Sequence, residues 1–397
     1  MSDFDVIIVG GGLAGSALAI GLAQAGSRVA LVEAFEPKAQ SRPSFDDRTL
    51  VVNAASLNIL SNLGILDDRL TTCALKRIEI SRAGAPGHLS LRAEEHGCER
   101  FGAVIVAREL GAAMLRRLEA LGTIESLCPE RLAAIDADDE HIEVELESGK
   151  RLRGQLLVGS DGTNSTVRRL AGIDSTRHDY GQSAMIFNVH CPGRQADTAW
   201  ERFTPVGPLA LLPQPDERLG VVWIDRNERI ESALALDDEA LLERLESRSG
   251  RAAGGFVSPG KRVSYPLALT RTPCPLGRRV VLVGNAANTI HPVSAQGFNL
   301  GLRDVAALVD HAGASDDPGH DDVLSAWLAD RQSDQAATVR YTDTLARAFS
   351  NPSSIMRLGT GLGLFAHAAV PAMSGRLVRA AMGFREPVSS LAAEVRR

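Results

Sequence analysis

The pattern of hydrophobic and polar residues near the N-terminus predicts a strand, a helix and a second strand. Residues 4–9 (FDVIIV) are almost wholly apolar and rich in β-branched side chains, as in a parallel-sheet strand that is covered on both faces. Residues 13–25 have the pattern of a helix that ends at Gly26, and residues 28–33 (RVALVE) have that of the next strand. Together these elements indicate a βαβ unit of about thirty residues.

The pattern continues with two helices and a group of strands. We expect helices over residues 53–63 and 108–121, and the second gathers its apolar side chains on one face. Residues 131–158 indicate a three-stranded meander. Within it, residues 141–147 (HIEVELE) alternate apolar and polar side chains, which is typical of a strand with one solvent-exposed face. Residues 156–158 have the pattern of a short buried strand.

The character of the chain changes over residues 181–270. Strand-like runs at residues 184–189, 209–212 and 219–225 are interrupted by proline and glycine, which favours an antiparallel sheet in a second domain. Parallel-sheet character returns at residues 279–284 (RVVLVG). We therefore expect the first domain to be discontinuous, with the second domain inserted through it.

The C-terminal third is predicted to be mainly helical. A helix begins around Asn299, residues 321–349 are mostly helical in pattern, and we expect helices in the tail over residues 351–397 as well. Residues 358–375 of this tail lack charged side chains, but their glycines and proline make them a poor membrane-spanning helix.

Composition narrows the class of protein. A length of 397 residues suggests two or three domains. The 44% hydrophobic and 23% charged residues are ordinary globular values, which argues against disorder and against a coiled coil. The formal net charge of -6 argues against a nucleic-acid-binding protein, because such proteins need a basic face for phosphates.

The cysteines and histidines indicate whether the protein has disulfides or a metal site, and the N-terminus indicates its cellular compartment. The five cysteines form no CxxC pair, and the nine histidines have no metal-ligand spacing, so we predict neither a disulfide framework nor a metal site. Asp3 and Asp5 stand where a secretory signal would carry positive residues. We expect a cytoplasmic protein.

A glycine-rich motif follows the first predicted strand and opens the first helix. In Gly10-x-Gly12-x-x-Gly15, the glycines permit a tight turn, close approach of a pyrophosphate and close packing of helix on strand. The helix N-terminus supplies N–H donors, and Glu33 at the end of the second strand is placed to accept hydrogen bonds from a ribose diol. The predicted dinucleotide-binding residues of this unit are Gly10, Gly12, Leu13, Ala14, Gly15 and Glu33.

This motif alone does not separate NAD from FAD. The order of a meander, then Asp161-Gly162, then an antiparallel domain resembles flavoproteins of the glutathione-reductase type. Residues 160–168 (SDGTNSTVR) are similar to the DG motif of flavin-dependent aromatic hydroxylases, in which the motif contacts FAD and is implicated in nicotinamide use. Taken alone, the pair is also compatible with a simple turn after a strand.

Residues 284–304 (GNAANTIHPVSAQGFNLGLRD) resemble a further motif of the same family, usually GD…P…GQG…N…G…D. Asn285 replaces the usual Asp and Ala295 replaces the first Gly of GQG. The resemblance implies that Pro292 lies beside the flavin ring and that a helix N-terminus faces its pyrimidine edge. The residues of this segment predicted to bind the cofactor are Gly284, Asn285, Pro292, Gln296, Gly297, Phe298 and Asn299.

Within this superfamily the chain most resembles the ubiquinone-biosynthesis hydroxylases. The supporting stretches are residues 45–48 (FDDR), 180–182 (YGQ), 201–203 (ERF) and 207–213 (GPLALLP). Asn285, together with residues 298–304, is most similar to the branch of 2-octaprenyl-6-methoxyphenol hydroxylases.

The resemblance implies an α/β fold with a Rossmann FAD-binding domain, an inserted antiparallel-sheet substrate domain and C-terminal helices. The implied bounds are 1–70, 100–180 and 272–350 for the FAD-binding domain, 71–99 and 181–271 for the substrate-binding sheet domain, and 351–397 for the helical tail.

The implied activity is that of an FAD-dependent monooxygenase. It would hydroxylate the ring of a prenylated phenol with NAD(P)H and O2 through a flavin C4a-hydroperoxide, and Pro292, Gln296 and Gly297 would hold the reacting groups in register. By the same resemblance, Arg48 lies near the flavin ribityl chain or phosphate, and Arg108 near the adenosine.

Several points stay open at this level. A small soluble aromatic substrate, a flavin-dependent polyprenyl reductase and a nucleotide-binding sensor are the alternatives. A base for the phenol could be His190, Tyr180 or His291, or the enzyme could use none. Residues 358–375, flanked by Arg357 and Arg376, could contact a membrane or a biosynthetic complex, or form a helical cover over the core.

Overall fold

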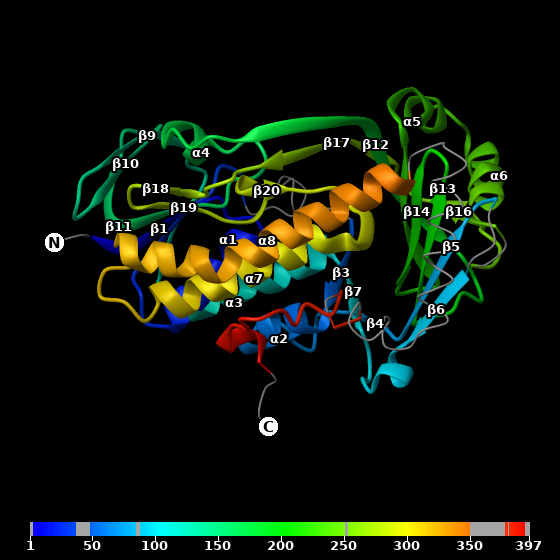
Figure 1. The fold of residues 1–397 in the computed structure, drawn as a ribbon, viewed down its shortest axis with the longest axis horizontal. Helices are drawn as coiled ribbons and strands as arrows, with labels where there is room; N and C mark the ends of the chain where they lie inside the picture. The colour runs from blue at the N-terminus through cyan, green and yellow to red at the C-terminus, as the bar shows by residue number, and fades with distance from the viewer. Residues whose placement is uncertain are drawn as a thin grey trace.

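The protein combines two large β-sheets with a layer of helices, and the predicted mixed α/β class is confirmed (Figure 1). The computed structural model describes residues 3–36, 48–84, 88–250, 253–349, 378–379 and 381–393. The predicted contribution of residues 358–375 lies outside these ranges, as do residues 45–47 of the FDDR stretch.

The first sheet contains the predicted parallel strands together with antiparallel pairings. Its strands lie in the order β18 (Leu276–Gly277), β19 (Val280–Leu282), β11 (Arg151–Gly159), β1 (Phe4–Val9), β2 (Val29–Val32) and β8 (Ile124–Leu127), and β10 (Ile142–Leu146) and β9 (Leu132–Ala137) continue from β11. The antiparallel pairings are those of β18 with β19, β11 with β10 and β10 with β9. Strand β1 pairs in parallel with both β11 and β2, which confirms the predicted βαβ unit. Residues 156–158 were expected as a separate short strand, and this was wrong: they end the long β11, which pairs first with β10 and then with β1 and β19.

The two faces of this sheet pack against different partners. Val6 and Ile8 of β1 contact α1 (Leu13–Gln24) and α7 (Gln296–Ala312), whereas Ile7 and Val9 lie against the β9–β10 meander. Alternate side chains of a strand point to opposite faces, so the apolar run of β1 fills both cores at once. Helices α3 (Ala107–Leu121) and α8 (Asp321–Phe349) extend the helical layer (Figure 1).

The second sheet has nine strands and forms the opposite end of the molecule (Figure 1). Its order is β20 (Asn288–Thr289), β17 (Val263–Arg271), β12 (Thr176–His190), β15 (Arg218–Arg226), β14 (Gly207–Gln214), β13 (Thr198–Thr204), β5 (Arg77–Arg82) and β6 (His88–Arg92), with β16 (Ser258–Pro259) paired to β12. The pairings are antiparallel except that of β13 with β5, so the predicted antiparallel sheet is present.

Two helices in this region were not predicted. Helices α5 (Asn227–Leu234) and α6 (Asp238–Ser249) cover one face of the second sheet, where Ile230 and Leu241 pack against Trp223. The side chain of Asp237 accepts a hydrogen bond from the Ala240 N–H and caps α6. The other face of the sheet is therefore left to line the space between the two sheets.

A small third sheet joins the two ends of the molecule. It consists of β3 (Thr49–Asn53), β7 (Gly102–Val106) and β4 (Cys73–Leu75), and α2 (Ala54–Asn62) follows β3 with Asn53 as its cap. The described part of the C-terminal tail lies against α2. There the Asn62 side chain donates to the Leu391 carbonyl oxygen, and that of Asn58 donates to the Ala392 carbonyl oxygen.

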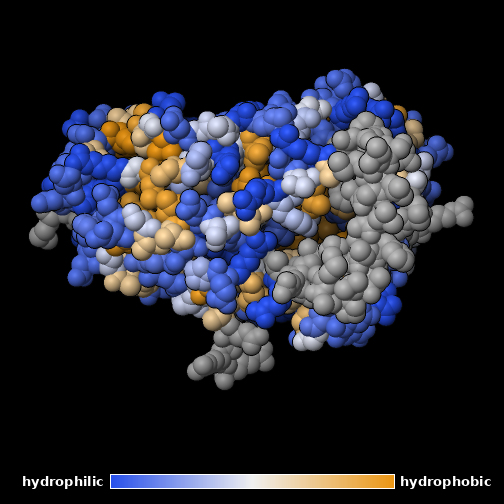
Figure 2. Space-filling view, in the orientation of Figure 1, coloured by the Kyte–Doolittle hydropathy of each residue, from blue (hydrophilic) through white to orange (hydrophobic). Residues whose placement is uncertain are grey.

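The described surface is mixed in character. Figure 2 shows a largely hydrophilic face with hydrophobic residues in scattered groups, which is ordinary for a folded protein. Within the described ranges, no helix has both the length and the apolar character that crossing a membrane requires.

A buried network of charges joins α7 to α8. Asp334 of α8 accepts from the Arg303 Nε at 2.7 Å and from Arg331 at 2.6 Å, and Arg331 also binds Asp304 at 2.8 Å. All four side chains are at most 5% exposed. Asp304 is the last residue of the segment that resembles the hydroxylase motif. It lies on α7, and its carboxylate binds Arg331 of α8.

We expect Asp334→Asn to lower the free energy of unfolding by about 3–5 kcal/mol, because it leaves two buried guanidinium groups without their shared anion. The matched control is Asp330→Asn on the same helix, whose carboxylate is 43% exposed and pairs with His311; its cost should stay below about 1 kcal/mol. Urea denaturation measures both, and equal costs would contradict the role given to the network.

The Asp334 carboxylate of this network makes its own contribution to how stability depends on pH. Burial alone would raise the pKa of Asp334, but the guanidinium groups of Arg303 and Arg331 hold it well below its usual range. The pKa is lower in the folded state, so the stabilisation is complete above the unfolded pKa of about 4 and is lost as the pH falls further.

Candidate active site

One large cavity lies between the two sheets and collects most of the predicted site residues. Its volume is about 1490 Å³, more than the roughly 300–1,000 Å³ of a pocket for one drug-sized ligand, so it has room for a dinucleotide and a second molecule. The predicted residues that line it are Gly10, Gly12, Leu13, Ala14, Glu33, Arg48, Asp161, Gly162, Gly284, Asn285, Pro292, Gln296, Gly297, Phe298 and Asn299. Gly15 and Arg108 are not among the lining residues.

The turn between β1 and α1 has the form that a phosphate needs. Gly10 has φ +105°, and a Cβ on it would lie 2.6 Å from the Ser160 carbonyl oxygen. A Cβ on Gly15 would lie 1.9 Å from the Gly10 carbonyl oxygen, so Gly15 serves close packing from behind the turn. Helix α1 begins after Gly12 without a side-chain cap and without an acidic residue in its first turn, which leaves its N–H donors to an anion.

The carboxylate of Glu33 is fixed at the end of β2. Its Oε2 accepts the Gly11 N–H at 2.6 Å and its Oε1 accepts the Phe35 N–H at 2.9 Å, with the residue 7% exposed. Each carboxylate oxygen can accept more than one hydrogen bond. The orientation is thus compatible with the predicted contact to a ribose hydroxyl.

Asp161 has a local structural function in the DG loop. Its carboxylate accepts from the Ser165 Oγ at 2.5 Å, the Thr166 N–H at 2.6 Å and the Val167 N–H at 3.1 Å. It thereby binds the first N–H groups of α4 (Thr166–Leu170), whose cap is Ser165. Gly162 follows with φ +82°, in the region that favours glycine. These bonds hold the loop against the cavity.

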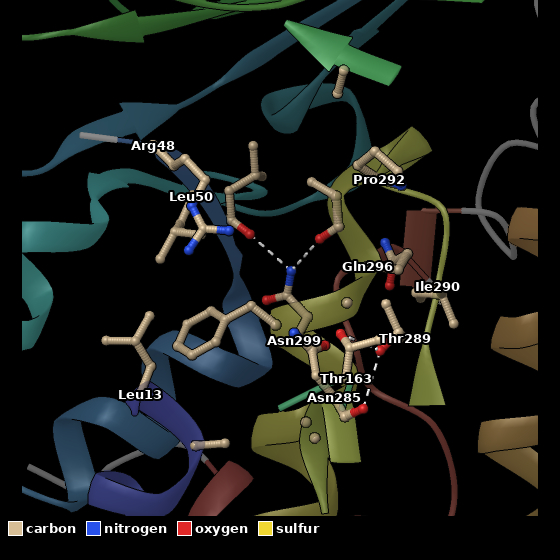
Figure 3. A pocket seen from close by; sticks show the side chains of 18 of the residues that line it. Leu13, Arg48, Leu50, Thr163, Asn285, Thr289, Ile290, Pro292, Gln296 and Asn299 are labelled. Carbon is tan, nitrogen blue, oxygen red and sulfur yellow. Dashed lines mark hydrogen bonds between the residues drawn. The ribbon is translucent and has the colours of Figure 1, made fainter. Parts of the chain in front are cut away.

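Two contacts that the sequence did not reveal join the DG loop to the segment after β19. Arg168 donates to the carbonyl oxygens of Thr163 and Ala286, both at 2.8 Å. The Thr289 hydroxyl donates to the Thr163 hydroxyl at 2.9 Å (Figure 3). The two motifs, more than a hundred positions apart in the chain, thereby form one wall of the cavity.

The backbone before α7 is strained where the sequence departs from the family pattern. Ser294 and Ala295 have φ values of +62° and +50°, in the left-handed region. A glycine at position 295 would adopt this conformation at little cost, which gives the physical reason for the glycine usual there. Helix α7 then begins at Gln296 without a side-chain cap, and Gln296, Gly297 and Phe298 line the cavity.

The Asn299 side chain holds the start of α7 in place. Its Nδ2 donates to the Val51 and Ala295 carbonyl oxygens, both at 2.8 Å (Figure 3). Its Oδ1 accepts the Asn53 N–H at 2.9 Å. These three bonds use both hydrogens of the amide nitrogen, so the side chain positions the helix. A hydrogen bond donated by Asn299 to a cofactor would come from its backbone.

The three residues considered as a phenol base do not line the cavity. Tyr180 donates its hydroxyl hydrogen to Asp343 at 2.9 Å, and burial together with this carboxylate raises the pKa of Tyr180 above its usual range. His291 is 1% exposed, and burial lowers its pKa to about 4. By contrast, Glu201 lines the cavity, and burial raises its pKa to about 7.

The residues present fit a flavin dinucleotide. Two helix N-termini without side-chain caps, those of α1 and α7, face one cavity, and a glycine turn and a fixed carboxylate stand beside the first of them. The first helix end suits the diphosphate, and the second would stabilise negative charge on a flavin ring.

Residues 3–340 match the family model of the FAD binding domain. The chain is 34% identical over 385 residues to ubiquinone hydroxylase UbiL of Rhodospirillum rubrum, which covers 96% of this chain and 89% of that protein. It is 32% identical to 3-demethoxyubiquinol 3-hydroxylase of Escherichia coli, with 96% and 98% covered. This chain belongs to the FAD-dependent aromatic hydroxylase family.

Solved structures share the fold of this FAD-dependent hydroxylase. PqsL, a probable FAD-dependent monooxygenase from Pseudomonas aeruginosa, superposes with a TM-score of 0.75 at 24% identity, covering 91% of this chain and 99% of that one. p-Nitrophenol 4-monooxygenase PnpA from Pseudomonas putida gives 0.76 at 18% identity, covering 96% and 98%.

We expect Arg48→Met to weaken FAD binding by this hydroxylase about tenfold to a hundredfold, since a hydrogen bond to a charged group contributes about 1.5–3 kcal/mol. Arg48 lines the cavity (Figure 3), whereas Arg108 at the start of α3 is exposed and outside the lining. Arg108→Met, the matched control, should change the affinity less. Titration of the apoprotein with FAD, followed by flavin fluorescence, measures both, and a larger effect at Arg108 would reverse the assignment.

Proposed function

We propose that this enzyme hydroxylates the aromatic ring of a prenylated phenol in ubiquinone biosynthesis, with FAD, NAD(P)H and O2. The observation that carries the proposal is a single cavity with a dinucleotide-binding end and an aliphatic end. The two relatives, named as a ubiquinone hydroxylase and a 3-demethoxyubiquinol 3-hydroxylase, support the substrate class.

The aliphatic end of the cavity suits an isoprenoid chain. It is formed by the open face of the second sheet and includes Ile78, Ile80, Leu89, Leu91, Ala184, Ile186, Ala199, Phe203, Ala210, Leu212, Val222 and Ile224. Apolar walls favour an apolar prenyl chain because burial removes the chain from water. Each buried CH2 group contributes about 0.8 kcal/mol to the free energy of binding.

Bound FAD, once reduced by NAD(P)H, supplies activated oxygen for transfer to the ring. The chain's own task is then to hold the ring and the flavin in register and to exclude water. We assign the positioning of the flavin edge to Pro292, Gln296 and Gly297, at the strained turn and the first turn of α7.

We propose the following division of the chain: an FAD-binding domain of residues 1–70, 100–180 and 272–350, a substrate domain of residues 71–99 and 181–271, and a tail from 351. The membership of β5 and β6 in the second sheet supports it. Two strand pairings join the proposed domains. Strand β4 of the substrate domain pairs with β7 of the FAD-binding domain, and β20 of the FAD-binding domain pairs with β17 of the substrate domain.

The test of the function is oxygen transfer from ¹⁸O2 to 2-prenylated phenols of increasing chain length, with phenol and 4-nitrophenol as the small soluble comparisons. We expect one ¹⁸O atom per product and a kcat/KM that rises at least tenfold for each isoprene unit that the cavity buries. Equal turnover of the small phenols would favour the soluble-substrate alternative. A reduced prenyl double bond without ¹⁸O would favour the reductase.

We also propose a peripheral contact with the inner face of the membrane through residues 358–375. The support is their apolar composition between Arg357 and Arg376, which suits an interface carrying anionic lipids. Truncation of the whole tail is a poor test, since Leu391 and Ala392 pack against α2 and accept its side-chain hydrogen bonds.

We therefore expect the double variant Leu364→Ser, Phe365→Ser to lose most of its cosedimentation with phosphatidylglycerol vesicles, because it removes apolar burial from this segment. Turnover of a short-chain phenol in solution should stay within about twofold. Wild-type cosedimentation by the variant would contradict the contact.

A further inference from the structure

One acidic side chain stands in the aliphatic wall of the cavity. Glu201 lies on β13, opposite Ala210 of β14 and Ile80 of β5, and all three line the cavity. Every other residue that β5, β13, β14 and β15 contribute to the lining is uncharged. Glu201 is therefore the one charged residue that these four strands contribute to the lining. Arg385 of the C-terminal tail also lines the cavity and, like Glu201, acts electrostatically on the Tyr341 hydroxyl.

Glu201 is close in the fold to the turn that precedes α7. Phe203, two positions along β13, packs with Val293, the residue after Pro292. Tyr341 of α8 also lines the cavity, and the carboxylate of Glu201 acts electrostatically on the Tyr341 hydroxyl. Glu201 thus stands where the aliphatic end of the cavity meets the segment assigned to the flavin.

The carboxylate of Glu201 has no structural partner comparable to those of Glu33 and Asp161, two other acids that line the cavity. Glu33 and Asp161 accept backbone N–H groups, whereas Glu201 makes no side-chain hydrogen bond or ion pair with any residue in the described ranges. Glu201 as a residue is only half-buried, because it faces the cavity, but the apolar groups packed around it raise its pKa to about 7. An acceptor of this kind is suited to general base chemistry near neutral pH.

We propose that the Glu201 carboxylate binds the hydroxyl group of the phenol substrate and accepts its proton during hydroxylation. The inference rests on the proposed function and identifies a catalytic residue for it. A phenol hydroxyl is the one polar group that such a substrate must bring to an otherwise aliphatic wall, and an ionised carboxylate accepts a hydrogen bond from it.

The proton transfer balances with the overall reaction. As the ring carbon ortho or para to the hydroxyl forms its bond to one atom of O2, the phenol O–H proton passes to Glu201 and the ring becomes a dienone. Loss of the C–H proton from that carbon restores the aromatic ring, and Glu201 returns its proton to the dienone oxygen. The other oxygen atom leaves as water, and NAD(P)H supplies the two electrons as a hydride. This hydride, the C–H proton and one proton from solvent account for the hydrogens of the new hydroxyl group and of the water.

The test compares Glu201→Gln with Glu79→Gln, a glutamate of the neighbouring β5 that does not line the cavity. The probe is 2-prenylphenol with the FAD-loaded enzyme. For wild type and Glu79→Gln we expect kcat/KM to fall as the pH drops through about 7, because protonation removes the acceptor. For Glu201→Gln we expect a loss of about 10²–10⁴-fold and no inflection near that pH.

Two further readouts separate catalysis from folding. Flavin content and the anaerobic rate of flavin reduction should match wild type in Glu201→Gln, and Glu201→Asp should recover part of the turnover. Infrared difference spectra should show a protonated carboxyl band that titrates near pH 7 in wild type, is absent from Glu201→Gln and shifts when 2-prenylphenol binds.

The outcomes distinguish the two proposals. If the wild-type enzyme hydroxylates no phenol, the proposed function fails. If it does, and Glu201→Gln keeps both the rate and the pH profile, the assignment of Glu201 is wrong.

Discussion

The amide of Asn299 is the contact on which the geometry of the cavity depends. It binds the backbone of β3 at Val51 and Asn53 and the backbone of Ala295, the residue before α7, so one side chain fixes the helix start to the small sheet. The turn before the helix holds two residues with positive φ, and a strained turn persists only when its surroundings fix it. Behind the helix, the buried charges of Arg303 and Asp334 hold α7 to α8. The uncapped end of α7 is thereby held rigidly against the cavity.

The two ends of the cavity use opposite physical chemistry. At one end, backbone N–H groups and a fixed carboxylate suit a charged dinucleotide, and glycine allows its close approach. At the other end of the cavity, an aliphatic sheet face suits the hydrophobic chain of a prenylated substrate. The reacting ring must lie between them, where the segment from Pro292 to Gln296 meets β13. This explains why a single carboxylate in the aliphatic wall is informative: it is the only charge that β5, β13, β14 and β15 contribute to the lining.

The sequence predicted the parts of the fold whose signals are local. The β-branched run of β1, the glycine turn and the helix after it are read within thirty residues, and the structure has them. Helices α5 and α6 were missed, although Asp237 before a leucine-rich run was a readable cap signal. The structural roles of Asp304 and Arg168 depend on partners distant in the chain. The stretch 201–203 supported the family resemblance, but a role for Glu201 could not be predicted from it, because its place on the cavity face follows from the pairing of β13 with β5, about 120 positions earlier.

If one continuous cavity holds flavin and phenol side by side, a crystal structure of the enzyme with FAD and 2-prenylphenol will show both in it. We expect the flavin ring against Pro292 and the first turn of α7, and the phenol hydroxyl within hydrogen-bond distance of the Glu201 carboxylate. A phenol bound outside the cavity, or a flavin ring turned away from α7, would contradict this arrangement.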